Sequence, residues 1–360
     1  MRPPRLAVLL LALLASAVPA AAGTGSGLTA VIQKAEQLRG LRTTHPLAVS
    51  AVGAAGMRRV VAGELAHERE PRSDAAWDEA LHLLGVLGRG QSLAAVQRAQ
   101  LAGQVAGLYV PRGGRLYVLA AGGKAPRSVI VHEVVHALQD EHFHLTRGPF
   151  AAHPQDHDEE LATTALVEGD ATEVQERYVA GLSPGDLVGE LATALGAVPS
   201  GSGARTPAYL ERQLLFPYTA GDAFVKALRA RGGQRLLDRA FAHPPRTTAA
   251  VLDPARYLAG DPPPQAVSLP PQSYAFTTTF GAEDVAALTG KDALARGWLG
   301  GRMGVGANGL ELRLATRAAA EVAAALRRVL PAAAQVAFNG RIVCVQIARE
   351  NPSVQGLSCR

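Results

Sequence analysis

Cysteine, lysine and long apolar runs are scarce in this chain, and each shortage excludes a class of protein. Only two of the 360 residues are cysteines, which excludes a disulfide-rich scaffold and a Cys-x-x-Cys redox or zinc site. Lysine occurs four times and the net charge is only +5, which does not indicate nucleic acid or a membrane surface as a partner. Beyond the first 22 residues no apolar run is long enough to span a bilayer.

The first 22 residues have the pattern of an export signal. Arg2 and Arg5 precede an apolar run from Leu6 to about Ala17, and Ala20-Ala21-Ala22 offers a small-residue cleavage site. We predict a Sec-type signal peptide that is cleaved after Ala22, and therefore a secreted or periplasmic protein without stable membrane insertion; a short N-terminal anchor is the alternative. The remaining 34 basic and 31 acidic residues give the mature chain a charge of +3.

Apolar periodicity and turn signals predict an α+β fold whose first part is mainly helical. A strand, a turn and a second strand are expected within residues 104–120, directly before a helix over 126–143. Further helices are expected over 28–42, 74–87, 93–106 and 159–179, the last capped by Asp158, and Phe216–Gly221 is expected to lead into one that ends near residue 229. We take residues 23–259 as one domain.

A second, smaller domain is expected after a proline-rich linker over residues 260–272. In residues 273–360, Asn308-Gly309 and Asn339-Gly340 each lie between alternating apolar runs, and a helical pattern lies between the two dipeptides. This C-terminal domain is therefore predicted to be α+β, with the order hairpin, helix, hairpin. In an exported protein Cys344 and Cys359 are expected to form a disulfide, with two unpaired thiols as the alternative.

The stretch His132-Glu133-Val134-Val135-His136 is the strongest chemical signal in the chain. Residues four apart on a helix share a face, so both imidazoles are able to ligate one metal ion. Glu133 is offset by one position, where it reaches a water on that ion. Two histidines, a carboxylate base and an open coordination position are the minimum for zinc-assisted hydrolysis.

A third ligand is needed, and Glu168 is the first candidate. It lies in Ala165-Leu-Val-Glu168-Gly169-Asp170-Ala171 on the next helix, where Gly169 is expected to let the two helices approach closely. His142, ten residues after His132, is the second candidate. Gln139 stands where metzincins, which use a third histidine, need a glycine, and this departure favours Glu168. Glu160 is a weaker alternative.

The two segments together resemble the gluzincins, zinc peptidases with two histidines and one glutamate as ligands. The resemblance covers about residues 104–180 and implies a zincin-like catalytic domain with Zn²⁺ on His132, His136 and Glu168. The 31-residue spacer before Glu168 is longer than in thermolysin-like enzymes, and Ala165 replaces the tryptophan of the family pattern. Where those enzymes place a histidine-orienting aspartate this chain has Thr172, so Thr172 or Asp170 is expected to take that role.

The resemblance implies a secreted zinc metallopeptidase that acts on peptide or protein substrates with Glu133 as general base. Such enzymes stabilise the oxyanion with a downstream side chain, for which Tyr218 and Tyr178 are candidates, although core packing is the more common role of a tyrosine. Asp140 either supports a ligand from behind or is a solvated acid. The alternative function is a zinc-containing module that is not a peptidase: another amide hydrolase, or a catalytically silent surface-binding protein.

Overall fold

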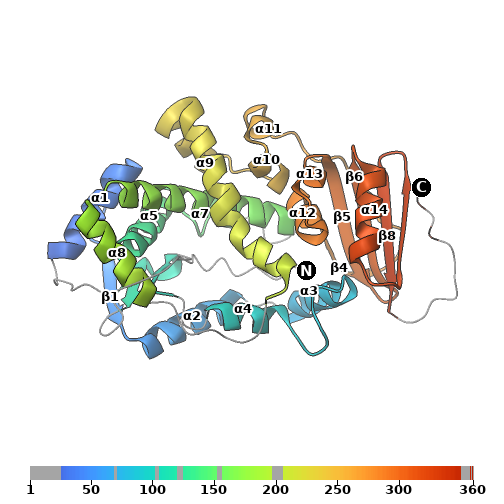
Figure 1. Ribbon diagram of the computed structural model, residues 1–360, viewed down its shortest axis with the longest axis horizontal. Coiled ribbons are helices and arrows are strands. Elements are labelled where there is room, and N and C mark those ends of the chain that lie inside the picture. Colours follow the sequence, from blue (N-terminus) through green and yellow to red (C-terminus); the bar gives the residue numbers. More distant parts are fainter. Residues whose placement is uncertain are drawn as a thin grey trace.

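The computed structural model describes residues 26–68, 71–101, 105–119, 125–151, 156–196 and 206–349 together with residues 357 and 359. The proposed signal peptide over residues 1–22 lies outside this range. The described chain mixes helices with two separate sheets, as the α+β prediction requires (Figure 1). None of its helices combines the length and apolarity needed to cross a membrane.

The smaller sheet has three strands in the order β1-β3-β2. The antiparallel pair β2 (Gly107–Val110) and β3 (Arg115–Leu119) confirms the expected strand-turn-strand, and Gly114 ends the connecting 3-10 turn with a φ of 55° that favours glycine. Strand β1 (Ala48–Val52) runs parallel to β3 and was not predicted. Strand β2 therefore forms one edge of the sheet.

Three long helices build the core around the predicted motif. They are α5 (Arg127–Phe143), α7 (His157–Ala180) and α9 (Ala208–Ala242), and α1 (Ser26–Arg39) packs against α5 and α7. The predicted helices over 126–143 and 159–179 are confirmed by α5 and α7. Phe216–Gly221 does not lead into a helix as expected, because it lies inside α9 despite Pro217.

Helices α7 and α9 cross in direct backbone contact at two glycines. A Cβ on Gly169 of α7 would lie 2.2 Å from the carbonyl carbon of Gly221, and a Cβ on Gly221 would lie 2.1 Å from the carbonyl oxygen of Ala165. Gly169 was expected to bring α7 close to the histidine helix. Its neighbour is α9 instead, so the absent side chain serves the packing of α7 on α9.

The larger sheet is antiparallel, with the order β4-β5-β6-β8-β7. Both predicted hairpins are confirmed, with helix α14 (Ala319–Val329) between them, and an additional strand, β4, lies at one edge. The strands are β4 (Tyr274–Thr278), β5 (Trp298–Gly306), β6 (Gly309–Thr316), β7 (Ala334–Asn339) and β8 (Ile342–Ala348).

The proline-rich segment over residues 260–272 packs along the larger sheet. The backbone N–H of Gln265 donates to the carbonyl oxygen of Leu299 at 2.8 Å, and the Gln265 carbonyl would collide with a Cβ on Gly300. The hydrophobic core beneath this sheet also includes Trp77 and Leu81 of α3. Helix α3 and the larger sheet, which are far apart in the sequence, therefore share one hydrophobic core.

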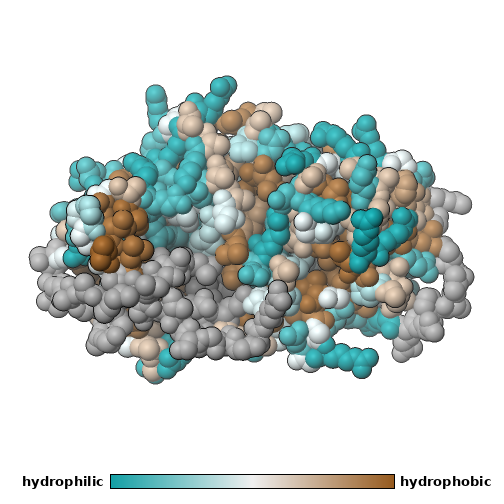
Figure 2. All heavy atoms as spheres, in the orientation of Figure 1, coloured by the Kyte–Doolittle hydropathy of each residue, from teal (hydrophilic) through white to brown (hydrophobic). Residues whose placement is uncertain are grey.

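The remaining helices are short or peripheral. Helix α8 exposes Val188 and Leu191, and Figure 2 shows one of several hydrophobic patches of this face where Figure 1 draws α8. These helices are α2 (Ala54–Glu68), α3 (Pro71–Leu83), α4 (Leu93–Leu101), α6 (Gly148–Ala151), α8 (Pro184–Gly196), α10 (Thr248–Leu252), α11 (Pro254–Leu258), α12 (Ala282–Thr289) and α13 (Asp292–Ala295).

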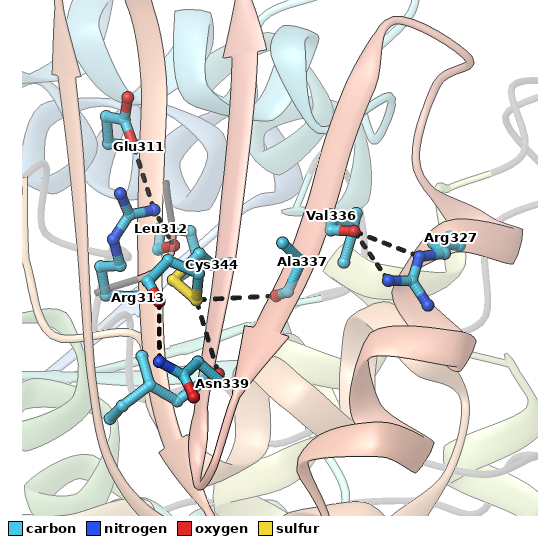
Figure 3. Close-up of a disulfide and its surroundings, with 10 residues drawn as sticks. Glu311, Leu312, Arg313, Arg327, Val336, Ala337, Asn339 and Cys344 are labelled. Carbon is cyan, nitrogen blue, oxygen red and sulfur yellow. Dashed lines mark hydrogen bonds and ion pairs between the residues drawn. A yellow bond between two sulfur atoms is a disulfide. The ribbon is translucent and has the colours of Figure 1, made fainter. Parts of the chain in front are cut away.

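A disulfide joins Cys344 to Cys359, as predicted, with their Cα atoms 5.6 Å apart (Figure 3). Cys344 lies in β8, and the Asn339 side-chain N–H donates to the Cys359 carbonyl at 3.2 Å. The bond and this contact attach Cys359 to the hairpin formed by β7 and β8.

Candidate metal centre

Helix α5 carries three of the four predicted site residues. Pro126 precedes its first turn, and the otherwise unpaired N–H groups of Arg127 and Ser128 donate to the Glu190 carboxylate of α8 at 3.2 and 2.6 Å. A carboxylate at this end of a helix interacts favourably with the helix dipole. Helix α8 thus stabilises the first turn of α5, one turn before His132.

Helix α7 carries Glu168. Its N-cap is Asp156, whose carboxylate accepts the N–H groups of Asp158 and Glu159, so the expectation that Asp158 caps the helix is wrong. Asp158 is buried instead and accepts hydrogen bonds from both the backbone and the hydroxyl of Thr248. The cap sits two residues earlier because the extended backbone that a cap needs is found at Asp156.

The structure brings His132, His136 and Glu168 together. The Glu168 Oε2 atom lies 3.1 Å from His132 Nε2 and 3.5 Å from His136 Nε2, and one ligand atom from each residue falls within 4.8 Å of the others. All three side chains are at most 1% exposed. The arrangement places three metal-ligating atoms around one point.

Two buried atoms of this group have no hydrogen-bond partner among the residues that the structure describes. They are His136 Nε2 and Glu168 Oε1. Leaving such atoms unsatisfied in the interior is costly, and a cation between them removes the cost. Two imidazole nitrogens and one carboxylate are the donor set of several catalytic zinc sites, so these residues fit Zn²⁺.

The other ligand candidates lie away from this point. His142 is exposed, and its Nε2 donates to the carbonyl oxygen of Arg42 at 2.8 Å. Glu160 is not part of the group. Asp140 accepts hydrogen bonds from the Tyr109 hydroxyl at 2.9 Å and the Leu145 N–H at 3.1 Å, which makes it neither a free surface acid nor a partner of a ligand.

Glu133 lies between the histidines and strand β2. The Tyr109 N–H donates to Glu133 Oε2 at 2.7 Å, while Oε1 is buried and has no hydrogen-bond partner within the described part of the chain. Gly107 leaves the space that this side chain needs, since a Cβ there would lie 3.0 Å from Glu133 Cγ. Burial raises the pKa of Glu133 to about 8, against the opposing effects of His136 and the Tyr109 N–H. The carboxyl group is thereby suited to gain and lose a proton near neutral pH.

The electrostatics of the three ligands follow from burial and mutual contact. Burial lowers the pKa of His132. Burial also opposes charge on His136, but the Glu168 carboxylate outweighs it and the pKa of His136 rises. For Glu168 burial favours the neutral form, yet the two histidines together lower its pKa. Glu168 is therefore held as the anion that a metal ligand has to be.

Two glutamines orient the histidines, and the sequence reasoning assigned neither of them this role. Gln139 Oε1 lies 2.8 Å from His136 Nδ1, and Gln175 Oε1 lies 3.1 Å from His132 Nδ1. Neither Thr172 nor Asp170 contacts a histidine directly. Among the described residues the Thr172 hydroxyl has no hydrogen-bond partner, and Asp170 is connected to His136 only through Gln139. The contact between His136 and Gln139 could have been expected from their spacing, because residues three apart are neighbours on a helix surface.

The two candidate tyrosines have different surroundings. The Tyr218 ring, on α9, stacks on His132 at a centroid distance of 6.3 Å and an interplanar angle of 27°. Tyr178 lies near Glu190 and Arg127, at the start of α5. Of these two tyrosines, Tyr218 is the one that borders the ligand group.

Comparison with known proteins does not assign the chain. No protein-family model, no curated protein and no solved structure matches it. Inference about its function therefore depends on the geometry of the four residues His132, Glu133, His136 and Glu168.

Proposed function

We propose that the chain is a secreted, zinc-dependent metallopeptidase of the gluzincin type. The observation that carries the proposal is the convergence of the His132, His136 and Glu168 side chains beside Glu133, one of whose buried carboxylate oxygens has no partner among the described residues. The export pattern over residues 1–22 supports the secreted location. Peptides or proteins are the proposed substrates.

Three ligands favour a catalytic site over a structural one. Structural zinc is almost always held by four protein side chains, whereas catalytic zinc has three and keeps a position for water or substrate. Within the described part of the chain no further His, Cys, Asp or Glu joins His132, His136 and Glu168 in the group. These three donors thus leave the fourth coordination position of a bound zinc ion open to water or substrate.

The proposed hydrolysis uses bound zinc and three residues around it. Bound zinc would supply a Lewis acid that polarises the peptide carbonyl and lowers the pKa of water to about 7. Glu133 accepts the proton of the attacking water and then donates it to the departing amine. The Tyr109 N–H fixes one oxygen of Glu133 and leaves the other for this transfer. The Tyr218 hydroxyl is the proposed donor to the oxyanion.

The complete burial of Glu133 and the two histidines favours the alternative function, a zinc-containing module that is not a peptidase. Glu133 is 0% exposed, as are both histidines. A catalytically silent protein needs no path from solvent to this carboxylate. An amide hydrolase with a small substrate needs only a narrow one.

Metal content and peptide cleavage, measured on the same preparation, separate these functions. We expect the mature chain, residues 23–360, to hold one zinc ion per molecule and to cleave members of a diverse peptide mixture read by mass spectrometry. His136→Ala would lose both properties. Stoichiometric zinc with no cleavage of any peptide would favour the non-peptidase module, and a chain that takes up no zinc would rule out both functions.

A further inference from the structure

A chain of buried hydrogen bonds leads from the second histidine to the first helix of the protein. Gln139 faces His136 with its carbonyl oxygen and donates from Nε2 to the Val167 carbonyl at 3.0 Å and to Asp170 Oδ2 at 2.9 Å. Asp170 in turn accepts the Nε–H of Arg39 at 2.6 Å. Arg39 is the last residue of α1.

The partners of Gln139 determine which way its amide points. A backbone carbonyl and a carboxylate accept hydrogen bonds and cannot donate them, so the NH₂ end has to face Val167 and Asp170. The amide oxygen is then the group that faces His136, and Nδ1 of that imidazole has to carry the proton. The lone pair is left on Nε2, the atom that points toward Glu168. This is the tautomer that a metal ligand requires.

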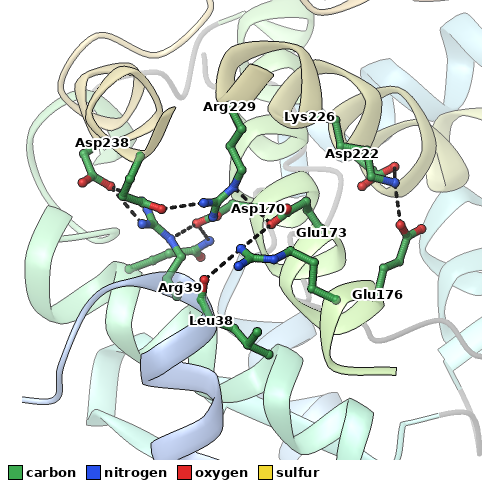
Figure 4. Close-up of polar contacts among 12 residues, drawn as sticks. Leu38, Arg39, Asp170, Glu173, Glu176, Asp222, Lys226, Arg229 and Asp238 are labelled. Atoms are coloured by element: carbon green, nitrogen blue, oxygen red, sulfur yellow. Dashed lines mark hydrogen bonds and ion pairs between the residues drawn. The ribbon is translucent and has the colours of Figure 1, made fainter. Parts of the chain in front are cut away.

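Arg39 holds Asp170 in place from the other side. Its side chain is 0% exposed, and it also pairs with Asp238 at 2.9 Å (Figure 4). Its guanidinium lies within 5.7 Å of the ring centres of Phe143 and Phe241. Arg229 of α9 adds a longer contact to Asp170 at 3.5 Å. A buried carboxylate without such cations would be costly, so Asp170 depends on α1.

We propose that Arg39 is a positioning residue of the metal centre. Acting through Asp170 and Gln139, it selects the tautomer of His136, so that α1 is a permanent part of the centre and not a segment removed on activation. The inference rests on the proposed zinc-binding role of His136. It concerns metal affinity, and peptide cleavage is not needed to test it.

The other histidine provides a matched comparison within the same site. The Gln175 side chain contacts His132 Nδ1, and in the described part of the chain it makes no second hydrogen bond that would orient its amide. Gln175→Met therefore removes one contact to a ligand, whereas Gln139→Met removes the contact and the connection to Asp170. Lys226→Met is the external control, because it breaks an exposed ion pair with Glu176 between α7 and α9.

The first measurement is the zinc dissociation constant of the full mature chain, obtained by competition with a chromophoric chelator. Loss of the partner that orients a metal-ligating histidine typically weakens metal binding about 10- to 100-fold. We expect a weakening in that range for Gln139→Met and for Arg39→Met, a smaller one for Gln175→Met and none for Lys226→Met. Circular dichroism would check that each variant is folded.

A charge swap keeps the inference testable where Arg39→Met does not fold. Gln139→Glu alone places its carboxylate beside the Asp170 carboxylate and the Val167 carbonyl, so it is expected to weaken zinc binding. Asp170→Asn alone is the milder change, because the Val167 carbonyl still fixes the NH₂ end of Gln139. In the double variant the amide introduced at position 170 is able to donate to the carboxylate introduced at position 139. That carboxylate still accepts the His136 Nδ1–H, and the net charge is unchanged. We expect the double variant to bind zinc at least about tenfold more tightly than Gln139→Glu alone.

Two results would overturn the inference while leaving the proposed function in place. One is wild-type zinc affinity in Gln139→Met or in a folded Arg39→Met. The other is a double variant that binds no better than the weaker of its two parents. A wild-type chain that binds zinc but cleaves nothing would leave the inference standing, and one that binds no zinc would overturn the inference together with the proposed function.

Discussion

Substituting Gly169 by alanine tests how the packing of α7 on α9 supports Glu168. The new Cβ would lie 2.2 Å from the Gly221 carbonyl carbon, 2.3 Å from its oxygen and 2.7 Å from the Asp222 nitrogen. All three are backbone atoms, which cannot rotate out of the way. Ordinary contact begins at 3.4 Å, so the two helices have to separate locally by about 1 Å.

The net magnitude follows from two opposing effects. Overpacking of a well-packed interior costs about 1–3 kcal/mol, and more where only backbone is able to yield. Replacing glycine inside a helix by alanine returns about 0.5–1 kcal/mol. Taking the upper end of the overpacking cost, we expect Gly169→Ala to lower the free energy of unfolding by about 2 kcal/mol and, because Glu168 is the preceding residue, to weaken zinc binding as well.

Gly63→Ala is the matched control for this substitution. Gly63 is an exposed residue within helix α2, and a Cβ there would meet nothing within 4 Å. We expect it to stabilise the chain by about 0.5–1 kcal/mol without changing zinc affinity. Chemical denaturation of both variants supplies the comparison. If Gly169→Ala proved as stable as Gly63→Ala, the close contact between α7 and α9 would be refuted.

Three further outcomes are expected. If the Tyr218 hydroxyl stabilises the oxyanion, Tyr218→Phe should lower kcat by about 10²- to 10³-fold in steady-state cleavage and leave the zinc affinity, measured by metal titration, unchanged. An unchanged kcat would assign Tyr218 to core packing. Burial opposes charge on His157, but Asp284 outweighs it and raises the pKa of His157 from 6.5 to about 9. The stabilisation that charged His157 contributes is therefore complete below pH 6.5 and lost as the pH rises through 9. The difference in unfolding free energy between wild type and His157→Gln should shrink over that range, and a constant difference would contradict the ion pair. Cys359→Ser should lower stability by up to about 3 kcal/mol in denaturant titration without changing zinc binding, since the disulfide joins only the C-terminal segment to β8.

Local regularity explains which features were predictable from the sequence. A four-residue spacing places His132 and His136 on one helical face in any α-helix, and the hairpin turns at Asn308-Gly309 and Asn339-Gly340 follow from backbone preference alone. Glu168 was found because a known family pairs the two segments. In each case the information lies within a few residues or in a shared pattern.

Contacts between distant segments were not predictable in the same way. Arg39 and Asp170 are 131 residues apart, and no periodicity in either helix indicates that they meet. The glycine at 169 was recognised as a close-contact position, but its partner helix was assigned wrongly because a missing side chain does not identify the neighbour that fills its place. Strand β1 is five residues long, too short for alternation to separate it from a loop.

Peptide cleavage by Glu133→Gln against Glu141→Gln tests the proposed peptidase activity most directly. Both substitutions replace a carboxylate by its isosteric amide on α5, but Glu141 contacts Thr44 at the protein surface and not the ligand group. With zinc loading verified for both, we expect Glu133→Gln to lower kcat by about 10²- to 10⁴-fold and Glu141→Gln to leave it unchanged. Full turnover by zinc-loaded Glu133→Gln would contradict the assignment of Glu133 as general base.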